Sequence, residues 1–421
     1  MHKRVNGILQ GAVTPPPSKS QAHRLLICAA LGTAPVSVAC SSVNDDILAT
    51  MHSLNALGAN IEYRNGVFNV IPVSLQKGAT LDCGESGSTL RFLVPVAAVL
   101  GAEATFVGRG KLPMRPMGSL CDALQEHGIA FMRHTPGLEL PVTCSGTLSG
   151  GKYTLPGNIS SQYLTGLLFA LPLAPADSEI EIVGGLTSAS YIGMTINALQ
   201  QAGISVERYG DCYKIKSGQE YRLTGDIAVE GDWSSAAFWI VAGVVGKSPV
   251  KVCGMNASSL QGDRRIIDHL RSMGAYIEIT PDAIVAMPSQ LFGAEIDCMD
   301  TPDLLPILSV AAATARGETL FTNVGRLRFK ESDRLAAMKS VLASFGIASV
   351  VGEDTFTVTG GKAEAMRPVD TFGDHRIAMS AAILSTIADG VTCIEGAECV
   401  AKSYPSFFED FAALGGKVSD I

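Results

Sequence analysis

Six copies of one pattern, recurring about every 70 residues, constrain what this chain of 421 residues can fold into. In each copy a helical stretch ends at a glycine and a short apolar alternation follows, as in "LNALGANIEY" and "LQQAGISVER". The glycines are Gly58, Gly128, Gly203, Gly274, Gly346 and Gly415, so successive copies lie 70, 75, 71, 72 and 69 residues apart. A glycine at this place suits a left-handed helix C-cap, and the alternation after it predicts a strand.

A second pattern alternates with the first, because a polar cluster six times opens an apolar helical stretch that closes on glycine or proline. The openings are "SKSQAHR", "GESGSTLR", "NISSQYL", "GDWSSAA", "DTPDLLP" and "FGDHRIA". Helices that are apolar on nearly all sides are buried. Each repeat therefore predicts one buried helix, one amphipathic helix and several short strands, a module much larger than a thin solenoid repeat.

Six modules divide naturally as three and three. The third ends near Lys216, and residues 217–232 and the prolines at 15–17 are interpreted as two crossovers. The expected fold class is α/β, with two similar three-module domains that span residues 14–226 and residues 1–13 plus 227–421. The first 13 residues are expected to add a strand to the second domain. Two domains joined in this way can close on a ligand.

The composition limits the partners that the chain is expected to have. Hydrophobic residues make up 47% and charged residues 17%, which indicates a large buried interior. A net charge of −8 argues against nucleic acid, so a bound anion must be held by local cations. The ten cysteines form no CxxC pair and are interpreted as core residues in a reducing cytosol. The start "MHKRVNGILQ" lacks a signal-peptide core and no apolar run is long enough to span a bilayer, which predicts a cytoplasmic protein without a membrane partner.

Cations at the predicted helix starts are the strongest functional signal. A helix N-terminus carries partial positive charge and free N–H groups, so it attracts anions and disfavours cations. Lys19, Arg24, Arg91 and Arg376 nevertheless lie at such starts. A cation there needs an anion nearby, either a side chain or a ligand, and the repetition indicates a ligand with several negative groups. The hydroxyl, amide and imidazole groups at the same starts are Ser20, Ser88, Ser160, Ser161, Gln162 and His375, of which the serines could also be ordinary N-caps.

The amphipathic stretches add further cations and the acid/base candidates. They contribute Arg115 in "KLPMRPMGSL", Lys330, Glu331 and Arg334 in "RFKESDRLAAM", and Lys402 in "VAKSYPSFF". Taken alone, "KESDR" could be a solvated first turn and Asp303 in "DTPDLLP" a cap. Asp303 and Glu331 are the acid/base candidates, besides Lys19, Lys402 and His375. There is no phosphate-binding GxxxxGK[ST] loop, no GxGxxG after a strand and no metal-ligand spacing, so neither a cofactor nor a metal is expected.

Taken together, these motifs resemble the 5-enolpyruvylshikimate-3-phosphate (EPSP) synthase family, the enolpyruvyl transferases of the shikimate pathway. The resemblance runs from "PPPSKSQAHR" to "AKSYPSFF" and includes "GESGSTLRFL", "RPMGSL", "SSQYLTGLL", "RFKESDR" and "DHRIAM". It implies two inside-out α/β domains, each of three βαβαββ units. A monomer without a cofactor is expected. In the implied reaction the 5-hydroxyl of shikimate 3-phosphate attacks C2 of phosphoenolpyruvate, C3 is protonated, and phosphate leaves the tetrahedral intermediate.

The same resemblance assigns residues to the two substrates. For phosphoenolpyruvate they are Lys19, Gly87, Arg91, Arg115, Gln162, Arg334, His375, Arg376 and Lys402. For shikimate 3-phosphate they are Lys19, Ser20, Arg24, Ser160, Ser161, Gln162, Ser188, Tyr191, Asp303 and Lys330. The resemblance implies that Asp303 is the base for the 5-hydroxyl. Glu331 and Lys19, assisted by Lys402, are implied as the acid/base pair at C3.

The chain departs from the family in one motif, because the frequent Asn-Ala-Gly-Thr is "ESGS" here, from Glu85 to Ser88. Gly87 is kept and leaves the space in which glyphosate lodges in the family, so glyphosate sensitivity is expected. The sequence does not show which cation the carboxylate of Glu85 pairs with beside an anion site. The alignment of "NVGRLRFKESDR" leaves the roles of Asn323 and Arg328 open.

Two other functions remain open at this point. The first is a sister enzyme, UDP-N-acetylglucosamine enolpyruvyl transferase, which would be expected to carry a loop cysteine as its acid. Cys121 follows Arg115 by six residues but falls inside an amphipathic helical stretch. The second is a non-catalytic protein that merely clamps an anion, which the joint presence of Asp303, Glu331 and Lys19 argues against.

Overall fold

The computed structural model describes residues 1–281 and 283–421, and the contacts among them divide the chain into two compact units. The central unit is Lys19–Val229, and the terminal unit is Met1–Ser18 together with Glu230–Ile421. The boundaries expected from the sequence differ from these by a few residues. That residues 14–226 and residues 1–13 plus 227–421 fold as separate domains stays a prediction.

The described residues form six four-stranded sheets, and each sheet belongs to one repeat of the sequence. Three repeats are continuous in the chain and run strand, helix, strand, helix, strand, strand. Their first two strands pair in parallel and the rest antiparallel, as in the order β6-β7-β9-β8. The first consists of β6 (Thr80–Asp82), α3 (Gly87–Leu100), β7 (Ala104–Val107), α4 (Gly118–Gln125), β8 (Ile129–Arg133) and β9 (Val142–Gly146). The second consists of β10 (Gly151–Pro156), α5 (Ser161–Ala170), β11 (Ser178–Val183), α6 (Ala189–Gln201), β12 (Val206–Tyr209) and β13 (Cys212–Ile215). The third consists of β18 (Glu295–Asp297), α9 (Leu305–Thr314), β19 (Glu318–Thr322), α10 (Arg334–Ser344), β20 (Ser349–Val351) and β21 (Thr355–Thr359).

The other repeats take a strand from a distant part of the chain. In the central unit, β14 (Ile227–Ala228) pairs in parallel with β3 (Val36–Ala39), which lies about 190 residues earlier in the chain. β14 thus supplies the first strand of a repeat whose other parts all precede it. The remaining parts of that repeat are α1 (Lys19–Ala30), α2 (Asp45–Ala56), β4 (Asn60–Arg64) and β5 (Val67–Ile71).

The N-terminal residues supply strands to the terminal unit. Residues 11–13 form β2 (Gly11–Val13), which pairs with β15 (Val250–Cys253), and residues 2–7 form β1 (His2–Gly7), between β23 (Thr392–Glu395) and β24 (Gly416–Asp420). Residues 1–13 thus contribute two strands where the sequence predicted one. The other elements of these repeats are α7 (Trp233–Val245), α8 (Ile266–Ser272), β16 (Tyr276–Ile279), β17 (Ala283–Met287), β22 (Val369–Asp370), α11 (His375–Ser385) and α12 (Phe407–Ala413).

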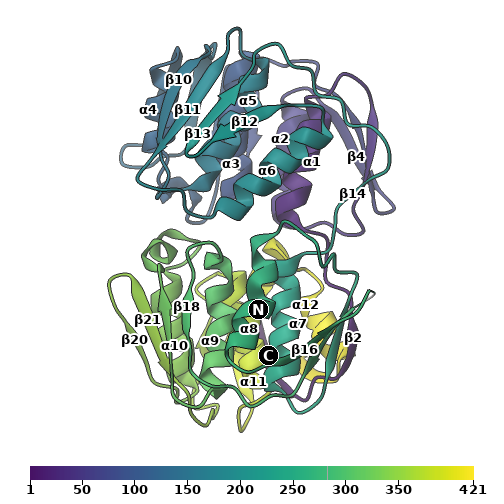
Figure 1. Ribbon diagram of the computed structural model, residues 1–421, viewed down its shortest axis with the longest axis vertical. Helices are drawn as coiled ribbons and strands as arrows, with labels where there is room; N and C mark the ends of the chain where they lie inside the picture. The colour runs from purple at the N-terminus through teal and green to yellow at the C-terminus, as the bar shows by residue number, and fades with distance from the viewer. Residues whose placement is uncertain (282) are drawn as a thin grey trace. The chain divides into compact units, whose positions relative to one another are not determined.

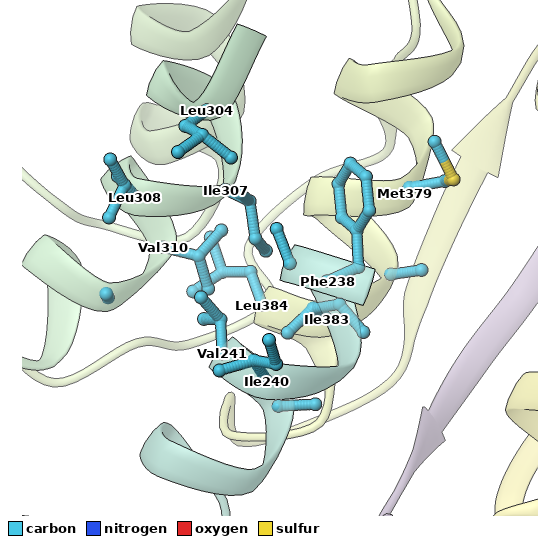
Figure 2. Packing of buried hydrophobic residues seen from close by; sticks show 14 of the residues in the cluster. Phe238, Ile240, Val241, Leu304, Ile307, Leu308, Val310, Met379, Ile383 and Leu384 are labelled. Atoms are coloured by element: carbon cyan, nitrogen blue, oxygen red, sulfur yellow. The ribbon is translucent and has the colours of Figure 1, made fainter. Parts of the chain in front are cut away.

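The core of the terminal unit is made by the helices that open the repeats. α7, α9 and α11 pack against one another, and Figure 2 shows side chains of these helices meeting in the core, among them Phe238, Ile307 and Leu384. The sheets lie on the flanks of this unit, with β18, β20 and β21 on one side and β2 and β16 on the other (Figure 1). In the central unit, α5 packs against α3 and α6, and α1 packs against α2 and α6. Helices inside and sheets outside confirm the predicted inside-out α/β fold.

The repeat glycines have the backbone conformation that the sequence predicted. Gly58, Gly128, Gly203, Gly274, Gly346 and Gly415 have φ between 74° and 107°. This region of φ is strained for any residue with a side chain, so glycine ends the helix at the lowest cost. The predicted buried helices also begin at their polar openings, as at α3, whose N-cap Ser86 accepts a hydrogen bond from the Thr89 amide. Among the helices of the described residues, none is long and apolar enough to cross a membrane.

Candidate functional site

The predicted site residues fall into two clusters, one in each unit, and each cluster is described by itself. The central cluster comprises Lys19, Ser20, Arg24, Gly87, Arg91, Arg115, Ser160, Ser161, Gln162, Ser188 and Tyr191. The terminal cluster comprises Asp303, Lys330, Glu331, Arg334, His375, Arg376 and Lys402.

Lys19 is the first residue of α1 and pairs with a carboxylate of the neighbouring helix. Its Nζ lies 2.8 Å from Oδ2 of Asp46 in the first turn of α2. The Asp46 side chain is only 7% exposed, whereas 18% of the Lys19 side chain is exposed. A mostly buried carboxylate thus holds the Lys19 ammonium, while part of the Lys19 side chain remains exposed.

Arg24 is buried one turn further along α1 and ties this helix to α6. Its Nε donates to Oγ1 of Thr195 at 3.0 Å, and its Nη2 donates to the backbone oxygen of Tyr191 at 2.9 Å. Its Nη1 donates to the backbone oxygen of Ser20 at 2.6 Å. Burial lowers the pKa of Arg24 to about 10, so the guanidinium still carries its charge near neutral pH. The structure therefore places Arg24 beside Ser20 and Tyr191, and that these residues bind one ligand stays a prediction.

Two guanidinium groups converge on Gly87 at the start of α3. A Cβ added to Gly87 would lie 2.6 Å from Nη1 of Arg91 and 2.8 Å from Nη1 of Arg115. Arg91 donates to Oε1 of Gln162 at 3.0 Å and to the backbone oxygen of Pro116 at 2.9 Å. Two cations above the free N–H groups of a helix start form a site suited to a carboxylate or a phosphate.

The α5 start adds hydroxyl and amide groups to the same cluster. Ser160 is the N-cap of α5 and its Oγ accepts a hydrogen bond from the Gln162 amide. Gln162 also donates through Nε2 to Oγ of Ser88 at 3.1 Å, which links α5 to α3. The neighbouring Ser161 is the first residue of α5 and is buried.

Ser188 precedes α6 with a left-handed backbone, φ 57°. This conformation is uncommon for a serine, and such strain recurs at ligand sites. The buried Ser188 and the adjacent first turn of α6, with Tyr191, complete the central cluster.

Arg334 organises the terminal cluster. This first residue of α10 is 1% exposed, and its guanidinium binds Asp303 at 2.6 Å, Glu331 at 2.8 Å and Asp374 at 2.8 Å. Burial alone would lower the pKa of Arg334, but these carboxylates raise it above its ordinary value. One arginine thus holds Asp303 and Glu331, which the sequence named as acid/base candidates.

Asp303 lies in the 3-10 turn η4 (Pro302–Leu304) among several cations. Besides Arg334, its carboxylate binds Lys330 at 3.3 Å and Arg376 at 3.4 Å. Burial opposes ionisation of Asp303, yet Arg376, Lys330 and Arg334 together hold its pKa well below the usual range. Burial also lowers the pKa of Lys330. A carboxylate in this field is stably ionised, and a hydroxyl placed against it would meet an acceptor.

Glu331 binds Arg334 directly, and Lys402 and His375 each lie next to a carboxylate that Arg334 binds. Lys402, at the end of the 3-10 turn η6 (Ala397–Lys402), has its Nζ 3.9 Å from Oε1 of Glu331. His375 opens α11 and is 1% exposed, with Nδ1 3.8 Å from Oδ1 of Asp374. An ammonium beside a carboxylate provides both a proton donor and a proton acceptor.

Several residues lie on other elements than the sequence suggested. Arg115, Glu331 and Lys402 were assigned to amphipathic helices, but they lie in the turns that precede α4, α10 and α12. Arg328, whose role was left open, donates to the backbone oxygen of Gly352 at 2.6 Å. Turns before a helix place side chains at its N-terminal end, which explains why these residues still join the clusters.

Two other residues with open roles are also directed elsewhere. Asn323 donates to Oδ1 of Asp297 at 2.8 Å. Glu85 turns toward Gly110, because a Cβ built there would collide with its carboxylate.

Sequence reasoning missed two carboxylates that position the cations. Asp374 is fully buried, binds Nε of Arg334 and caps α11 by accepting from the Arg376 amide at 3.0 Å. Its place just before "HRIA" signals a cap, but nothing local signals the arginine 40 residues earlier. Asp46 likewise reads as an ordinary residue of a helix start in "NDD", and only the fold reveals Lys19 as its partner.

Comparison with known proteins gives one consistent result. Residues 4–411 match the family model described as EPSP synthase (3-phosphoshikimate 1-carboxyvinyltransferase). A 3-phosphoshikimate 1-carboxyvinyltransferase of Clostridium kluyveri is 42% identical over 417 residues, which cover 98% of this chain and 96% of the relative. The corresponding protein of Clostridium acetobutylicum is 40% identical over 420 residues, with 98% and 96% covered.

Solved structures give the same picture at lower identity. The EPSP synthase of Acinetobacter baumannii matches with a TM-score of 0.81 and 26% identity, and all of both chains is covered. An enolpyruvyl transferase, NikO of Streptomyces tendae, matches with a TM-score of 0.78, 18% identity, and 99% and 98% of the two chains covered. At that identity the second match supports the fold alone.

Proposed function

Because the chain belongs to the EPSP synthase family, we propose that both clusters serve one reaction, the transfer of the enolpyruvyl group of phosphoenolpyruvate to the 5-hydroxyl of shikimate 3-phosphate. The hydroxyl oxygen bonds to C2 while C3 takes up a proton, which gives a tetrahedral intermediate. That intermediate loses a proton from C3 and releases phosphate, so the products are the enolpyruvyl ether and inorganic phosphate. Both substrates carry a phosphate and a carboxylate, and shikimate 3-phosphate also brings the hydroxyl that is to be activated. The clustered cations offset the repulsion between these anions.

We assign the ionisable residues the roles that the family resemblance implies, and their surroundings support this assignment. Asp303 accepts the proton of the 5-hydroxyl, and Glu331 and Lys19 exchange the proton at C3 with Lys402 assisting. His375 lies beside this exchange. A residue that remains ionised among cations is an effective hydrogen-bond acceptor for an attacking hydroxyl, and fixed orientation of both reactants supplies a further part of the acceleration.

The remaining residues bind the substrates. Phosphoenolpyruvate is held by the cations and by the close approach at Gly87, through Lys19, Gly87, Arg91, Arg115, Gln162, Arg334, Arg376 and Lys402. Shikimate 3-phosphate is held through Lys19, Ser20, Arg24, Ser160, Ser161, Gln162, Ser188, Tyr191, Asp303 and Lys330. No cofactor takes part in this proposal.

The observation that carries these roles is the arrangement around Arg334. Its Nη1 and Nη2 lie 2.6 Å from Asp303 and 2.8 Å from Glu331, so one rigid guanidinium sets the spacing of the two carboxylates. A planar, permanently charged group is well suited to this task, because it cannot give up its proton during the reaction. In this proposal Asp303 acts on the 5-hydroxyl and Glu331 acts at C3. A fixed spacing between the two carboxylates keeps each of them in reach of its atom.

Phosphate release from phosphoenolpyruvate tests the function directly. We expect release with shikimate 3-phosphate and none with a UDP-aminosugar. Lys19→Met and Glu331→Ala should each abolish turnover, while the matched surface variants Lys216→Met and Glu181→Ala, whose side chains form exposed ion pairs, should keep it. Near wild-type kcat in either site variant would remove the assigned role, and release of no phosphate with either acceptor would leave a binding protein.

The alternative enolpyruvyl transfer to a UDP-aminosugar lacks its expected acid. Cys121 is 2% exposed inside α4, and burial raises the pKa of its thiol to about 12. A thiol with this pKa is a poor proton donor at neutral pH and is inaccessible to a substrate. Cys121→Ala should therefore keep full turnover, and its loss would favour the alternative.

The proposal also places the enzyme in the cytoplasm as a monomer with small-molecule partners only. All ten cysteines are free thiols, which suits a reducing compartment. Light scattering coupled to gel filtration should give the mass of a single chain, and a dimer at micromolar concentration would contradict this part.

A further inference from the structure

Two loops of the central unit run side by side. One joins β6 to α3 and contains Glu85, and the other follows β7. The Cys83 amide donates to the backbone oxygen of Val107 at 2.9 Å. The Arg109 amide donates to the backbone oxygen of Gly84 at 2.8 Å. These two hydrogen bonds hold the loop after β7 against the loop that opens α3.

The carboxylate of Glu85 occupies the place that a side chain at Gly110 would need. A Cβ built on Gly110 would collide with Oε1 of Glu85 and would lie 2.5 Å from its Cδ, so the carboxylate lies against the Gly110 backbone. Gly110 also has a left-handed backbone, with φ 60°. The backbone conformation and the neighbouring carboxylate therefore both require glycine at this position.

The 3-10 turn η1 (Leu112–Met114) connects Gly110 to Arg115. The Leu112 amide donates to the backbone oxygen of Arg109 at 3.2 Å, and the Arg115 amide donates to the backbone oxygen of Leu112 at 3.1 Å. Hydrogen bonds of this kind tie each residue to the one three positions earlier, so the short segment moves as a unit. A displacement of the backbone at Gly110 is therefore passed on to Arg115.

The Arg115 guanidinium depends on this turn for its position. Its Nη1 lies 2.8 Å from the place of a Cβ on Gly87, while its buried Nε finds no hydrogen-bond partner among the described residues. We propose that Glu85 is a positioning residue that acts through Arg115: its carboxylate supports the turn at Gly110 and thereby keeps the Arg115 guanidinium at Gly87, where phosphoenolpyruvate binds in the proposed function. The inference rests on that proposed role of Arg115.

Steady-state kinetics of two variants tests the inference. In Glu85→Ala, KM for phosphoenolpyruvate should rise about tenfold, because a displaced guanidinium binds the anion less well. Both kcat and KM for shikimate 3-phosphate should stay within about threefold, because the proton transfers and the other substrate do not depend on Arg115. Glu85→Gln keeps the length of the side chain and one of its oxygens, so its KM for phosphoenolpyruvate should lie within about threefold of the wild-type value.

Two results in these variants contradict the inference. The first is a KM for phosphoenolpyruvate in Glu85→Ala that stays within about twofold of the wild-type value. The second is a Glu85→Gln variant as impaired as Glu85→Ala, because the glutamine retains the contact with Gly110 that the proposal depends on.

A double-mutant cycle with Arg115 tests whether Glu85 acts through that residue. Arg115→Ala alone should raise KM for phosphoenolpyruvate, and adding Glu85→Ala should then raise it by less than about twofold. A loss of packing without any connection to Arg115 would raise KM by the same factor in both backgrounds. The same factor in both backgrounds therefore overturns the inference.

Gly110→Ala disturbs the same contact from the other side. The added Cβ would push the Glu85 carboxylate away, so KM for phosphoenolpyruvate should rise as in Glu85→Ala. The control is Gly137→Ala, because Gly137 also has a left-handed backbone, with φ 77°, but a Cβ there meets nothing within 4 Å. Should Glu85→Ala fail to fold, this pair decides by itself, and equal KM values in the two glycine variants overturn the inference.

The outcomes separate this inference from the proposed function. A wild type that releases phosphate with shikimate 3-phosphate, together with variants that show none of these differences, overturns the role of Glu85 alone. A wild type that releases no phosphate with shikimate 3-phosphate overturns the proposed function instead.

Discussion

Replacing Gly87 by alanine should weaken phosphoenolpyruvate binding without weakening the fold. The added Cβ would lie 2.6 Å from Nη1 of Arg91, 2.8 Å from Nη1 of Arg115 and 3.1 Å from its Cζ. Non-bonded carbon and nitrogen atoms rarely approach within 3.4 Å, so the two guanidinium groups must retreat by about 0.8 Å and 0.6 Å. Both are ends of flexible side chains, and the backbone of α3 need not move.

The retreat disturbs the bonds from Arg91 to Gln162 at 3.0 Å and to the Pro116 oxygen at 2.9 Å. Weakened charged hydrogen bonds and a displaced pair of cations should cost about 1.5–3 kcal/mol of binding, which corresponds to a rise in KM for phosphoenolpyruvate of roughly 10-fold to 100-fold. The fold should gain up to about 1 kcal/mol, because alanine restricts the unfolded chain more than glycine does.

Steady-state kinetics and thermal unfolding measure the two effects separately. KM for phosphoenolpyruvate should rise while KM for shikimate 3-phosphate and the melting temperature change little. Gly118→Ala is a matched control, because Gly118 also begins a helix in the same unit but a Cβ there meets nothing within 4 Å. The reasoning would be refuted if the KM of Gly87→Ala for phosphoenolpyruvate stayed within twofold of that of the control. This limit corresponds to a difference in binding free energy on the order of 0.4 kcal/mol.

Three further predictions concern charge and inhibition. Arg334→Gln should lower the free energy of unfolding by about 3–5 kcal/mol in denaturant titrations, because it leaves Asp303, Glu331 and Asp374 facing one another in the interior. The control Arg328→Gln, at a partly exposed ion pair, should cost less than about 1 kcal/mol. Equal losses in the two variants would contradict this. Burial lowers the pKa of His23 from 6.5 to about 3, so the stability it contributes is present above pH 6.5 and is lost as the pH falls toward 3. His23→Asn should therefore reduce the slope of unfolding free energy against pH in this window by about 1.4 kcal/mol per unit, and an unchanged slope would show that His23 does not titrate on unfolding. Because Gly87 is retained, glyphosate should inhibit turnover in competition with phosphoenolpyruvate, and an IC50 in the millimolar range at modest phosphoenolpyruvate would argue against an open space at Gly87.

The parts of the fold that depend on neighbouring residues could be predicted from the sequence. The glycine caps, the buried helices and their polar starts each rest on a stretch of about ten residues, and all are present in the structure. The pairing of β14 with β3 could not be predicted, because a two-residue strand carries almost no periodic signal and β3 lies far away in the chain.

The candidate site likewise contains residues that the sequence signals and residues that it does not. Lys19, Arg91 and Arg376 stood out because a cation at a helix start conflicts with the helix dipole. Asp46 and Asp374 did not, because a carboxylate at a helix start agrees with the dipole and looks like an ordinary cap. Their functional meaning comes from partners 27 and 40 residues away, which only the packed structure brings into contact.

The pairing of β1 sets an order of events during synthesis of the chain. The central unit, Lys19–Val229, is continuous and can fold while the ribosome is still translating the rest. β1 is made long before its partners β23 and β24, which begin at Thr392 and Gly416. At roughly 5–20 residues per second, this strand waits on the order of 20–80 s with both edges unpaired. The residues of β1 thus leave the ribosome long before the strands that pair with them, so chaperone binding during synthesis should concentrate there.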